Sequence, residues 1–200
     1  MNNFVGRQLG NYRLIRLLGQ GGFADVYLGE HVYLKTLAAI KLLQARLASN
    51  DLEIFLKEAR AISSLIHHNI VRVLEFGVEG GTTPFLVMDY APHGTLRQRH
   101  LEGTRLAPAA IIPYVRQVAA ALQYAHDRKI IHRDIKPENM LLGQNNNVLL
   151  SDFGIAVVTQ SSRYSSTQDV VGTIGYMAPE QLNGKLMPAS DQYSLAVVVY

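Results

Sequence analysis

Five short stretches of the chain up to Tyr90 have the apolar character of β-strands. Their apolar residues alternate loosely with polar ones or form short runs, and turn-forming residues separate them. The five stretches are 12–18, 24–29, 38–43, 70–76 and 85–90. The first two flank a glycine-rich turn and so predict a hairpin, and 77–84 is expected to be the turn between the last two.

One helix is expected within this strand-rich region. Between Asp51 and Leu65, apolar residues recur at intervals of three and four, which is the spacing of one helix face. The residues of this face are Leu52, Phe55, Leu56, Ala59, Ile62 and Leu65.

Beyond Tyr90 the pattern becomes mainly helical. Residues 91–94 read as a linker, and a later apolar stripe predicts a long helix. The stripe consists of Tyr114, Val115, Val118, Ala119, Leu122 and Ala125. Because proline fits only the first turn of a helix, this helix is expected to start near Pro113 or to kink there.

Together these elements predict an α+β chain. We expect an N-terminal extension (1–11), a small antiparallel sheet lobe with one helix (12–88), a hinge (89–94) and a mainly helical lobe (95–200).

Composition narrows the class of protein. With 48% hydrophobic and 18% charged residues among 200, the chain can bury a core and is neither a disordered tail nor a fibrous repeat. A net charge of +3 gives no reason to expect nucleic acid as a partner. No apolar run is long enough to cross a bilayer and no signal peptide is visible, so we expect a cytoplasmic protein without membrane contact. The absence of cysteine excludes disulfides, thiolate metal sites and a cysteine nucleophile.

The glycine-rich turn is the first candidate binding site. Its glycines expose backbone N–H groups and let the main chain approach a phosphate closely. The turn and its flanks are Leu18, Gly19, Gln20, Gly21, Gly22, Phe23, Ala24, Asp25 and Val26. A strand follows it, which excludes a dinucleotide-binding motif, and the P-loop sequence is absent. Taken alone, such a turn is more often only a turn.

Two charged residues stand in apolar surroundings. Lys41 lies within the predicted strand 38–43, and Glu58 lies on the predicted helix. A lysine on the exposed face of a sheet and a solvated helical glutamate are the more frequent readings. A functional role for Lys41 would require an anionic partner, either a phosphate or the Glu58 carboxylate.

The segment 132–139 brings acid–base and metal-binding groups into one loop. The Asp134 carboxylate can accept a hydroxyl proton, while Lys136 neutralises a transferring phosphoryl group. The amide oxygen of Asn139 and the carboxylate of Asp152 suit Mg²⁺, which prefers oxygen ligands.

The order and spacing of these pieces carry a family resemblance. In chain order they are the glycine turn, Lys41, Glu58, His132-Arg133-Asp134 with Asn139, Asp152-Phe153-Gly154 and Ala178-Pro179-Glu180. This is the signature set of protein kinases. From about residue 12 to residue 200 the sequence resembles a Hanks-type, eukaryotic-like serine/threonine protein kinase, in a style typical of bacteria.

The resemblance implies a bilobal kinase-like fold and transfer of the γ-phosphoryl group of ATP to protein Ser/Thr hydroxyls, with Mg²⁺ or Mn²⁺. It makes the glycine turn the cover of the ATP phosphates, and Lys41 their partner, paired with Glu58. It makes Asp134 the proton acceptor, Lys136 the stabiliser of the γ-phosphoryl group, and Asn139 and Asp152 the metal ligands. The positions implied around the adenine and ribose are Val26, Ala39, Met88, Asp89, Ala91, Glu138 and Leu141.

The resemblance also implies regulation by autophosphorylation. The segment between Asp152 and Glu180 is rich in hydroxyls, and Thr167 is the first expected site, with Ser165 the second. A phosphate there can pair with Arg133 and order the segment. Self-association for trans-autophosphorylation is a further option.

One departure from the family pattern and three alternative readings remain open. The sequence given stops at Tyr200, inside a helix beginning near Ser190, where relatives are expected to continue; we therefore expect an incomplete helical lobe, a weakly active chain and a Glu180 deprived of its buried partner. A truncated or inactive kinase-like scaffold is the alternative function, and a small-molecule phosphotransferase fits less well. The cytosolic domain of a longer, membrane-anchored kinase is another reading.

Overall fold

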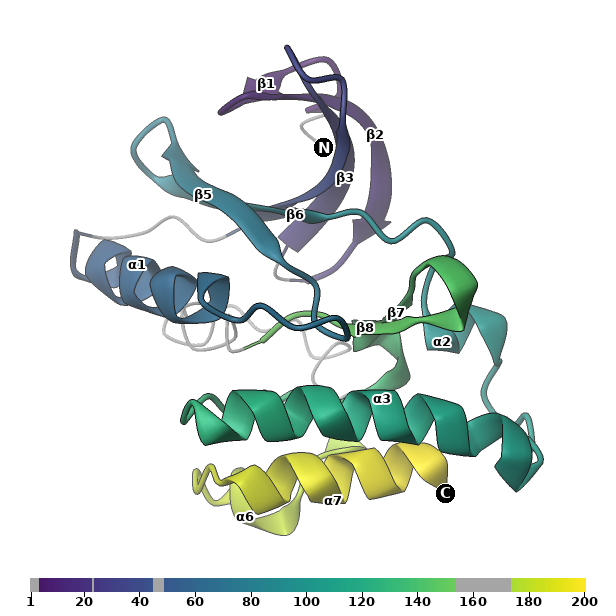
Figure 1. Cartoon of the computed structure of the whole chain (residues 1–200). Helices are drawn as coiled ribbons and strands as arrows, with labels where there is room; N and C mark the ends of the chain where they lie inside the picture. The colour runs from purple at the N-terminus through teal and green to yellow at the C-terminus, as the bar shows by residue number, and fades with distance from the viewer. Residues whose placement is uncertain (1–3, 23, 45–48, 154–173) are drawn as a thin grey trace. The chain divides into compact units, whose positions relative to one another are not determined.

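The structure, a computed structural model, describes residues 4–22, 24–44, 49–153 and 174–200 (Figure 1). Its described residues form two compact units. The first comprises the chain up to Ser63 together with Arg72–Tyr90, and the second comprises Ser64–Val71 and the described residues from Ala91 onward.

An antiparallel sheet makes up most of the first unit. Its six strands lie in the order β1-β2-β3-β4-β6-β5. Their bounds are Gln8–Leu9 (β1), Tyr12–Gln20 (β2), Ala24–His31 (β3), Leu37–Leu43 (β4), Val73–Glu79 (β5) and Thr83–Asp89 (β6). All five strands expected from the pattern are therefore present.

Two details of this sheet differ from the expectation. The chain before Tyr12 is not a plain extension, because β1 pairs Leu9 with Tyr12 and Leu9 is buried. The turn expected over 77–84 is shorter, since β5 continues to Glu79 and pairs it with Thr83. A two-residue strand is too short to show alternation, and Gly77 inside β5 reads as a turn residue in sequence.

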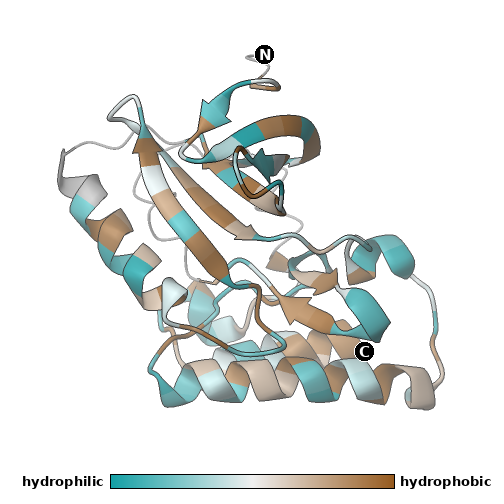
Figure 2. Cartoon of the chain, turned by 45° about the horizontal axis from the view of Figure 1, so that its top comes forward, coloured by the Kyte–Doolittle hydropathy of each residue, from teal (hydrophilic) through white to brown (hydrophobic). Residues whose placement is uncertain are grey.

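The core of the first unit lies on one face of the sheet. Along β2 only Tyr12 and Leu14 are buried, at alternate positions, whereas β4 and β6 are buried almost throughout, because residues on their opposite face are covered as well. This core cluster consists of Leu9, Tyr12, Leu14, Tyr27, Ala38, Ile40, Leu42, Phe85 and Val87. Figure 2 shows apolar residues running along the strands, interrupted by single polar positions.

Helix α1 (Ser49–Ser63) is the single helix predicted for this region. Phe55, Ala59 and Ile62 are buried along it, at the predicted helical spacing. Phe55 packs edge-on against Phe76 of β5, with ring centroids 6.5 Å apart. This contact attaches the helix to the sheet within the first unit.

The second unit is mainly helical. Its elements are α2 (Leu96–Arg99), α3 (Pro108–Asp127), η1 (Pro137–Asn139), β7 (Met140–Leu142), η2 (Gln144–Asn146), β8 (Val148–Leu150), α6 (Pro179–Leu182) and α7 (Pro188–Val199). Strands β7 and β8 form a small antiparallel hairpin. Helices α3 and α7 lie side by side (Figure 1). None of the helices in the described part of the chain is both long and apolar enough to cross a membrane.

Helix α3 begins earlier than the sequence suggested. Its first residue is Pro108, so the expected start near Pro113 is wrong and Pro113 lies inside the helix. Pro108 fits the first turn, where its missing N–H is no loss. The predicted apolar stripe is confirmed at Val118, Leu122 and Ala125, all of them buried.

Asn69 ties the segment 64–71 to the second unit. It is 1% exposed, and its amide nitrogen lies 2.9 Å from Gln117 Oε1 of α3 and 2.8 Å from the carbonyl oxygen of Val148 in β8. A buried amide bonded to two elements explains why this stretch does not belong with the sheet that surrounds it in sequence.

The close approach of β3 and β4 gives a stability test. A Cβ added at Gly29 would lie 2.1 Å from Cδ1 of Ile40, which is fully buried, whereas a Cβ at Gly19 meets no atom within 4 Å. We expect Gly29→Ala to lower the free energy of unfolding by about 1–3 kcal/mol through overpacking. Gly19→Ala is the matched control and should not destabilise. Denaturant unfolding of both variants checks this, and equal effects would contradict the packing described.

Candidate active site

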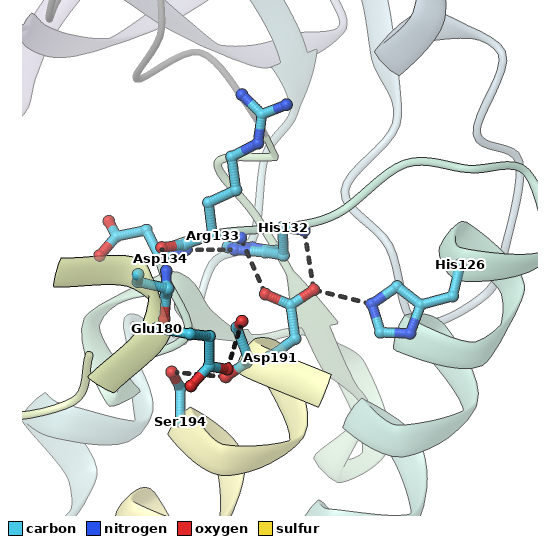
Figure 3. Close-up of polar contacts among 9 residues, drawn as sticks. His126, His132, Arg133, Asp134, Glu180, Asp191 and Ser194 are labelled. Carbon is cyan, nitrogen blue, oxygen red and sulfur yellow. Dashed lines mark hydrogen bonds and ion pairs between the residues drawn. The ribbon is translucent and has the colours of Figure 1, made fainter. Parts of the chain in front are cut away.

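The loop between α3 and β7 is shaped by one buried carboxylate. Asp191 of α7 is 1% exposed, and it accepts hydrogen bonds from the backbone N–H groups of His132 and Arg133, each at 2.8 Å (Figure 3). Its Oδ2 atom also lies 2.7 Å from Nε2 of His126 on α3. A buried charge is tolerated only when it is bonded in this way.

These bonds hold an unusual backbone conformation. Arg133 has a φ of 75°, in the left-handed region that residues with side chains rarely adopt. Its N–H is bound by Asp191, and its carbonyl oxygen accepts a bond from Gln181 Nε2 at 3.1 Å. The peptide groups before and after Arg133 are therefore both held by hydrogen bonds.

The Asp134 carboxylate is oriented by two neighbours. Its Oδ2 lies 2.9 Å from Nζ of Lys136 and accepts a 2.9 Å bond from Nδ2 of Asn139. The same amide nitrogen also bonds the Asp134 carbonyl oxygen at 2.8 Å. The second carboxylate oxygen, Oδ1, is buried and accepts no hydrogen bond from the residues that the structure describes. One oxygen is thus anchored, and the other can accept a proton.

His132 is a neutral imidazole whose ring is bonded to the loop that carries Asp134 and to the residue that follows β8. Nδ1 accepts the Asp134 N–H at 3.3 Å, so Nε2 carries the proton and donates to the carbonyl oxygen of Ser151 at 2.7 Å. The ring packs on Phe153 with centroids 4.5 Å apart. Burial lowers the pKa of His132, because the charged form would lose its hydration.

Asn139 and Asp152 meet the chemical requirement for a magnesium site. Both bonds of Asn139 to Asp134 use its amide nitrogen, which leaves the amide oxygen as the ligand atom. Asp152 follows β8 in a left-handed conformation, with a φ of 66°. The described residues hold no cluster of three or more His, Cys, Asp or Glu suited to a metal. An amide and a carboxylate suit Mg²⁺ that takes its other ligands from water and phosphate.

The candidate nucleotide residues of the first unit lie on three adjacent strands. Val26 of β3 is the pairing partner of Lys41 in β4, and Ala39 of β4 is the partner of Met88 in β6. Asp89 ends β6. Paired residues of an antiparallel ladder point to the same face, so Val26 and Lys41 share one face.

The glycine turn is closed by local bonds. Gly21 N–H donates to the Ala24 carbonyl oxygen at 2.9 Å. Gln44, just beyond β4, reaches the turn with its side-chain amide, 3.2 Å from Asp25 Oδ1 and 3.4 Å from the Gly21 carbonyl oxygen. No local pattern predicts this contact, because Gln44 lies outside the predicted strand.

The remaining predicted residues are only partly brought together. Glu58 lies half-buried on α1, in the same unit as Lys41. Leu141 lies in β7 and forms a bridge with Thr95, in the unit that also contains Ala91. Glu138 lies in η1. The remaining predictions, at Phe23, Gly154, Ser165 and Thr167, lie outside the described residues.

The Glu180 carboxylate is hydrogen-bonded within the second unit. Its Oε1 accepts a hydrogen bond from Oγ of Ser190 at 2.6 Å, and this bond lowers the pKa of Glu180. The Ser190 hydroxyl, on the next helix, thus supplies one hydrogen-bond donor to this carboxylate, and no motif in the sequence predicted it. The expected loss of the buried partner of Glu180 stays a prediction.

Comparison with known proteins agrees with this arrangement. The family model "Protein kinase domain" matches residues 12–200. The chain is 36% identical over 200 residues to the serine/threonine-protein kinase PrkC of Bacillus subtilis, covering 98% of this chain and 31% of PrkC. It is 38% identical over 204 residues to Pkn1 of Myxococcus xanthus, covering 98% and 29%. The chain thus spans about a third of the length of these relatives.

A solved structure shows the same fold. The PknI kinase domain of Mycobacterium tuberculosis superposes with a TM-score of 0.79 at 28% sequence identity. The match covers 100% of this chain and 76% of that one.

The neutral state of His132 predicts a dependence of stability on pH. Because its pKa is lower folded than the ordinary value of 6.5, the unfolded chain binds more protons below pH 6.5. We expect the free energy of unfolding to fall as the pH drops through this range. The fall should be at most about 1.4 kcal/mol for each pH unit, since one group binds at most one proton. Denaturant unfolding at several pH values measures it.

The matched variant is His132→Phe, which keeps a ring against Phe153. It should be less stable at neutral pH, by about 1–3 kcal/mol for the unsatisfied Ser151 carbonyl, but should show a shallower pH slope. His67, whose pKa is also lowered by burial, leaves a residual slope. An unchanged slope in His132→Phe would show that this histidine is not held neutral.

Proposed function

The chain belongs to the protein kinase family, and on that basis we propose that it is a serine/threonine kinase that transfers the γ-phosphoryl group of ATP to hydroxyls of protein substrates. Its fold is the kinase-domain fold, as the motifs predicted. The serine/threonine class is supported by the printed names of its relatives and by Lys136 in the loop.

One observation carries the proposal: the state of the Asp134 carboxylate. Its Oδ2 is held by Lys136 and Asn139, while Oδ1 accepts no bond from the described residues. Such a group is a positioned general base, because one oxygen fixes the orientation and the other can take a proton.

In the proposed reaction the residues of this loop have separate tasks. Asp134 orients the substrate hydroxyl and accepts its proton as the hydroxyl oxygen attacks the γ-phosphorus, while the bond from that phosphorus to the β–γ bridging oxygen breaks and ADP leaves. Lys136 lies beside the same carboxylate, and its positive charge stabilises the negative charge that develops on the transferring group. His132 and Asp191 touch no reactant and instead hold the loop backbone in place.

Asn139 and Asp152 are proposed to hold magnesium. When bound, Mg²⁺ neutralises phosphate charge and orients the phosphoryl group. Asn139 contributes its amide oxygen, since its nitrogen is committed to Asp134. Any substitution at this residue therefore affects both the metal ligand and the orientation of the base.

The first unit is proposed to bind the nucleotide. The glycine turn would present N–H groups to the phosphates, and Lys41 would supply a positive charge beside them, with Glu58 as its partner. Val26, Ala39 and Met88 would contact the base, since their pairing places them on the same face of the sheet as Lys41. Autophosphorylation at Thr167 or Ser165, and a cytosolic setting in a longer protein, remain part of this proposal.

A scaffold without phosphoryl transfer is the alternative function. The described catalytic positions argue against it, because Asp134, Lys136, Asn139 and Asp152 are all of the type the reaction requires. Only an activity measurement separates the two.

The direct test compares the chain with Asp134→Asn, using Mg²⁺ and γ-labelled ATP, with phosphorylated residues mapped by mass spectrometry. We expect the substitution to reduce phosphoryl transfer by at least about 100-fold, because it removes the base. Asp127→Asn is the matched control, since Asp127 is exposed at the end of α3, and it should retain transfer.

The outcomes separate the two functions. Label on hydroxyl residues in the parent chain and its loss only in Asp134→Asn would support the kinase. Nucleotide binding in all three proteins without any label would favour the scaffold. Equal labelling of the parent and Asp134→Asn would contradict the assigned role of Asp134.

A further inference from the structure

Arg97 of α2 connects two segments that lie far apart in sequence. Its Nε donates a 2.8 Å hydrogen bond to Oε1 of Glu138, in the turn that follows the loop of Asp134. Its Nη2 donates a second hydrogen bond to the hydroxyl of Tyr176, in the segment leading into α6. All three residues belong to the second unit. No motif in the sequence singles out Arg97.

The helix that carries Arg97 is firmly held. Thr95 caps it, with its hydroxyl accepting the Gln98 N–H at 3.1 Å and the Gln98 side chain accepting the Thr95 N–H at 3.0 Å. Leu96 is buried, and the Gly94 carbonyl oxygen accepts the Leu142 N–H at 2.8 Å. A four-residue helix fixed at its start to β7 therefore presents Arg97 from a defined position.

The segment around Tyr176 has few other attachments to the catalytic loop. Met177 N–H bonds the Ile174 carbonyl oxygen at 3.1 Å, which is a local turn. Gln181 reaches the Arg133 carbonyl oxygen at 3.1 Å, from the first turn of α6. Among the described residues, Arg97 is the side chain that joins Tyr176 itself to the loop region.

Arginine suits this position better than lysine. Its planar guanidinium directs separate N–H groups to two acceptors at once, whereas a lysine ammonium is a single point. The hydrogen bond to Glu138 raises the pKa of Arg97, so the group stays charged. The Arg97 and Glu138 side chains are 26% and 44% exposed, so the pair is partly screened by solvent and the geometry counts more than the charge.

We propose that Arg97 is a positioning residue for the protein substrate. By binding Glu138 and Tyr176 together, it fixes the surface that begins four residues after Asp134, over which a polypeptide must lie when it presents a hydroxyl to that carboxylate. ATP is expected to reach Glu138 only through its backbone, whereas Arg97 binds the Glu138 side chain, so ATP binding should depend little on Arg97. The inference rests on the proposed kinase function and assigns Arg97 a part in it that none of the kinase motifs covers.

The kinetic test uses Arg97→Met, Arg97→Lys and Tyr176→Phe in the full chain, with dephosphorylated casein as the protein substrate. Arg97→Met should raise the KM for casein about tenfold, the effect of losing hydrogen bonds to a charged group, and change the KM for ATP less than about twofold. Tyr176→Phe and Arg97→Lys each lose one of the two connections and should give smaller increases.

Arg99→Met is the matched control. Arg99 lies on the same helix, is exposed, and bonds Asn146 Oδ1 at 3.0 Å instead of the Tyr176 segment. The same change of residue type there should leave both KM values unchanged. A rise in casein KM for Arg99→Met equal to that for Arg97→Met would reduce the effect to surface charge and overturn the proposal.

A second measurement does not depend on activity. Amide hydrogen exchange at Met177 should be faster in Arg97→Met and Tyr176→Phe than in the parent, and unchanged in Arg99→Met. Unchanged exchange in all variants would refute the connection. An inactive parent would refute the kinase function and the positioning role with it, whereas an active parent whose Arg97→Met variant keeps its casein KM would refute the positioning role alone.

Discussion

The buried carboxylate of Asp191 is the constraint on which the second unit depends. It is almost completely removed from solvent, yet it carries two backbone N–H bonds from the loop and a contact with His126. Removing a carboxylate from water is unfavourable unless donors replace the lost hydration. The folded chain meets this requirement only when α7, α3 and the loop are assembled together, so the same bonds hold the helices and shape the site.

A short series of hydrogen bonds links Asp191 to the position of the Asp134 carboxylate. Asp191 fixes the peptide groups before and after His132, and this places Arg133 in its left-handed conformation. Asp134 then lies where Lys136 and Asn139 can bind a single oxygen of its carboxylate. The proposed role of Asp134 as a general base would benefit from this preorganisation, since no rearrangement would be needed when the reactants arrive.

Much of the fold and most of the motif residues could be predicted from the sequence, because strand alternation, helix spacing and motif order are local signals. The buried stripe of α3 and the strand holding Lys41 are examples. Elements too short to show a repeating pattern were missed. Strand β1 is an example, because its two residues are recognisable only by their pairing with β2. For α3 the sequence allowed a start near Pro113 or a kink there, and the helix instead begins at Pro108, a second proline that fits the first turn.

Residues that act through tertiary contacts left no local signal. His126, Gln44 and Arg97 belong to no sequence motif. The structural role of each depends on a partner between 19 and 65 residues away in the chain. Ser190 is a similar case, because only the folded chain brings its hydroxyl to the Glu180 carboxylate. The roles of Lys41, Asn139 and Asp152 toward ATP and magnesium stay predictions.

The most direct test of the account is amide hydrogen exchange at His132 and Arg133 in the parent chain and in Asp191→Asn. The substitution replaces one acceptor oxygen by an NH₂ group that faces N–H donors. The account predicts that both loop amides are strongly protected in the parent and exchange faster in the variant, while amides in the middle of α3 remain protected. Loop amides that exchange at the same rate in both proteins would contradict the claim that Asp191 holds the loop that carries Asp134.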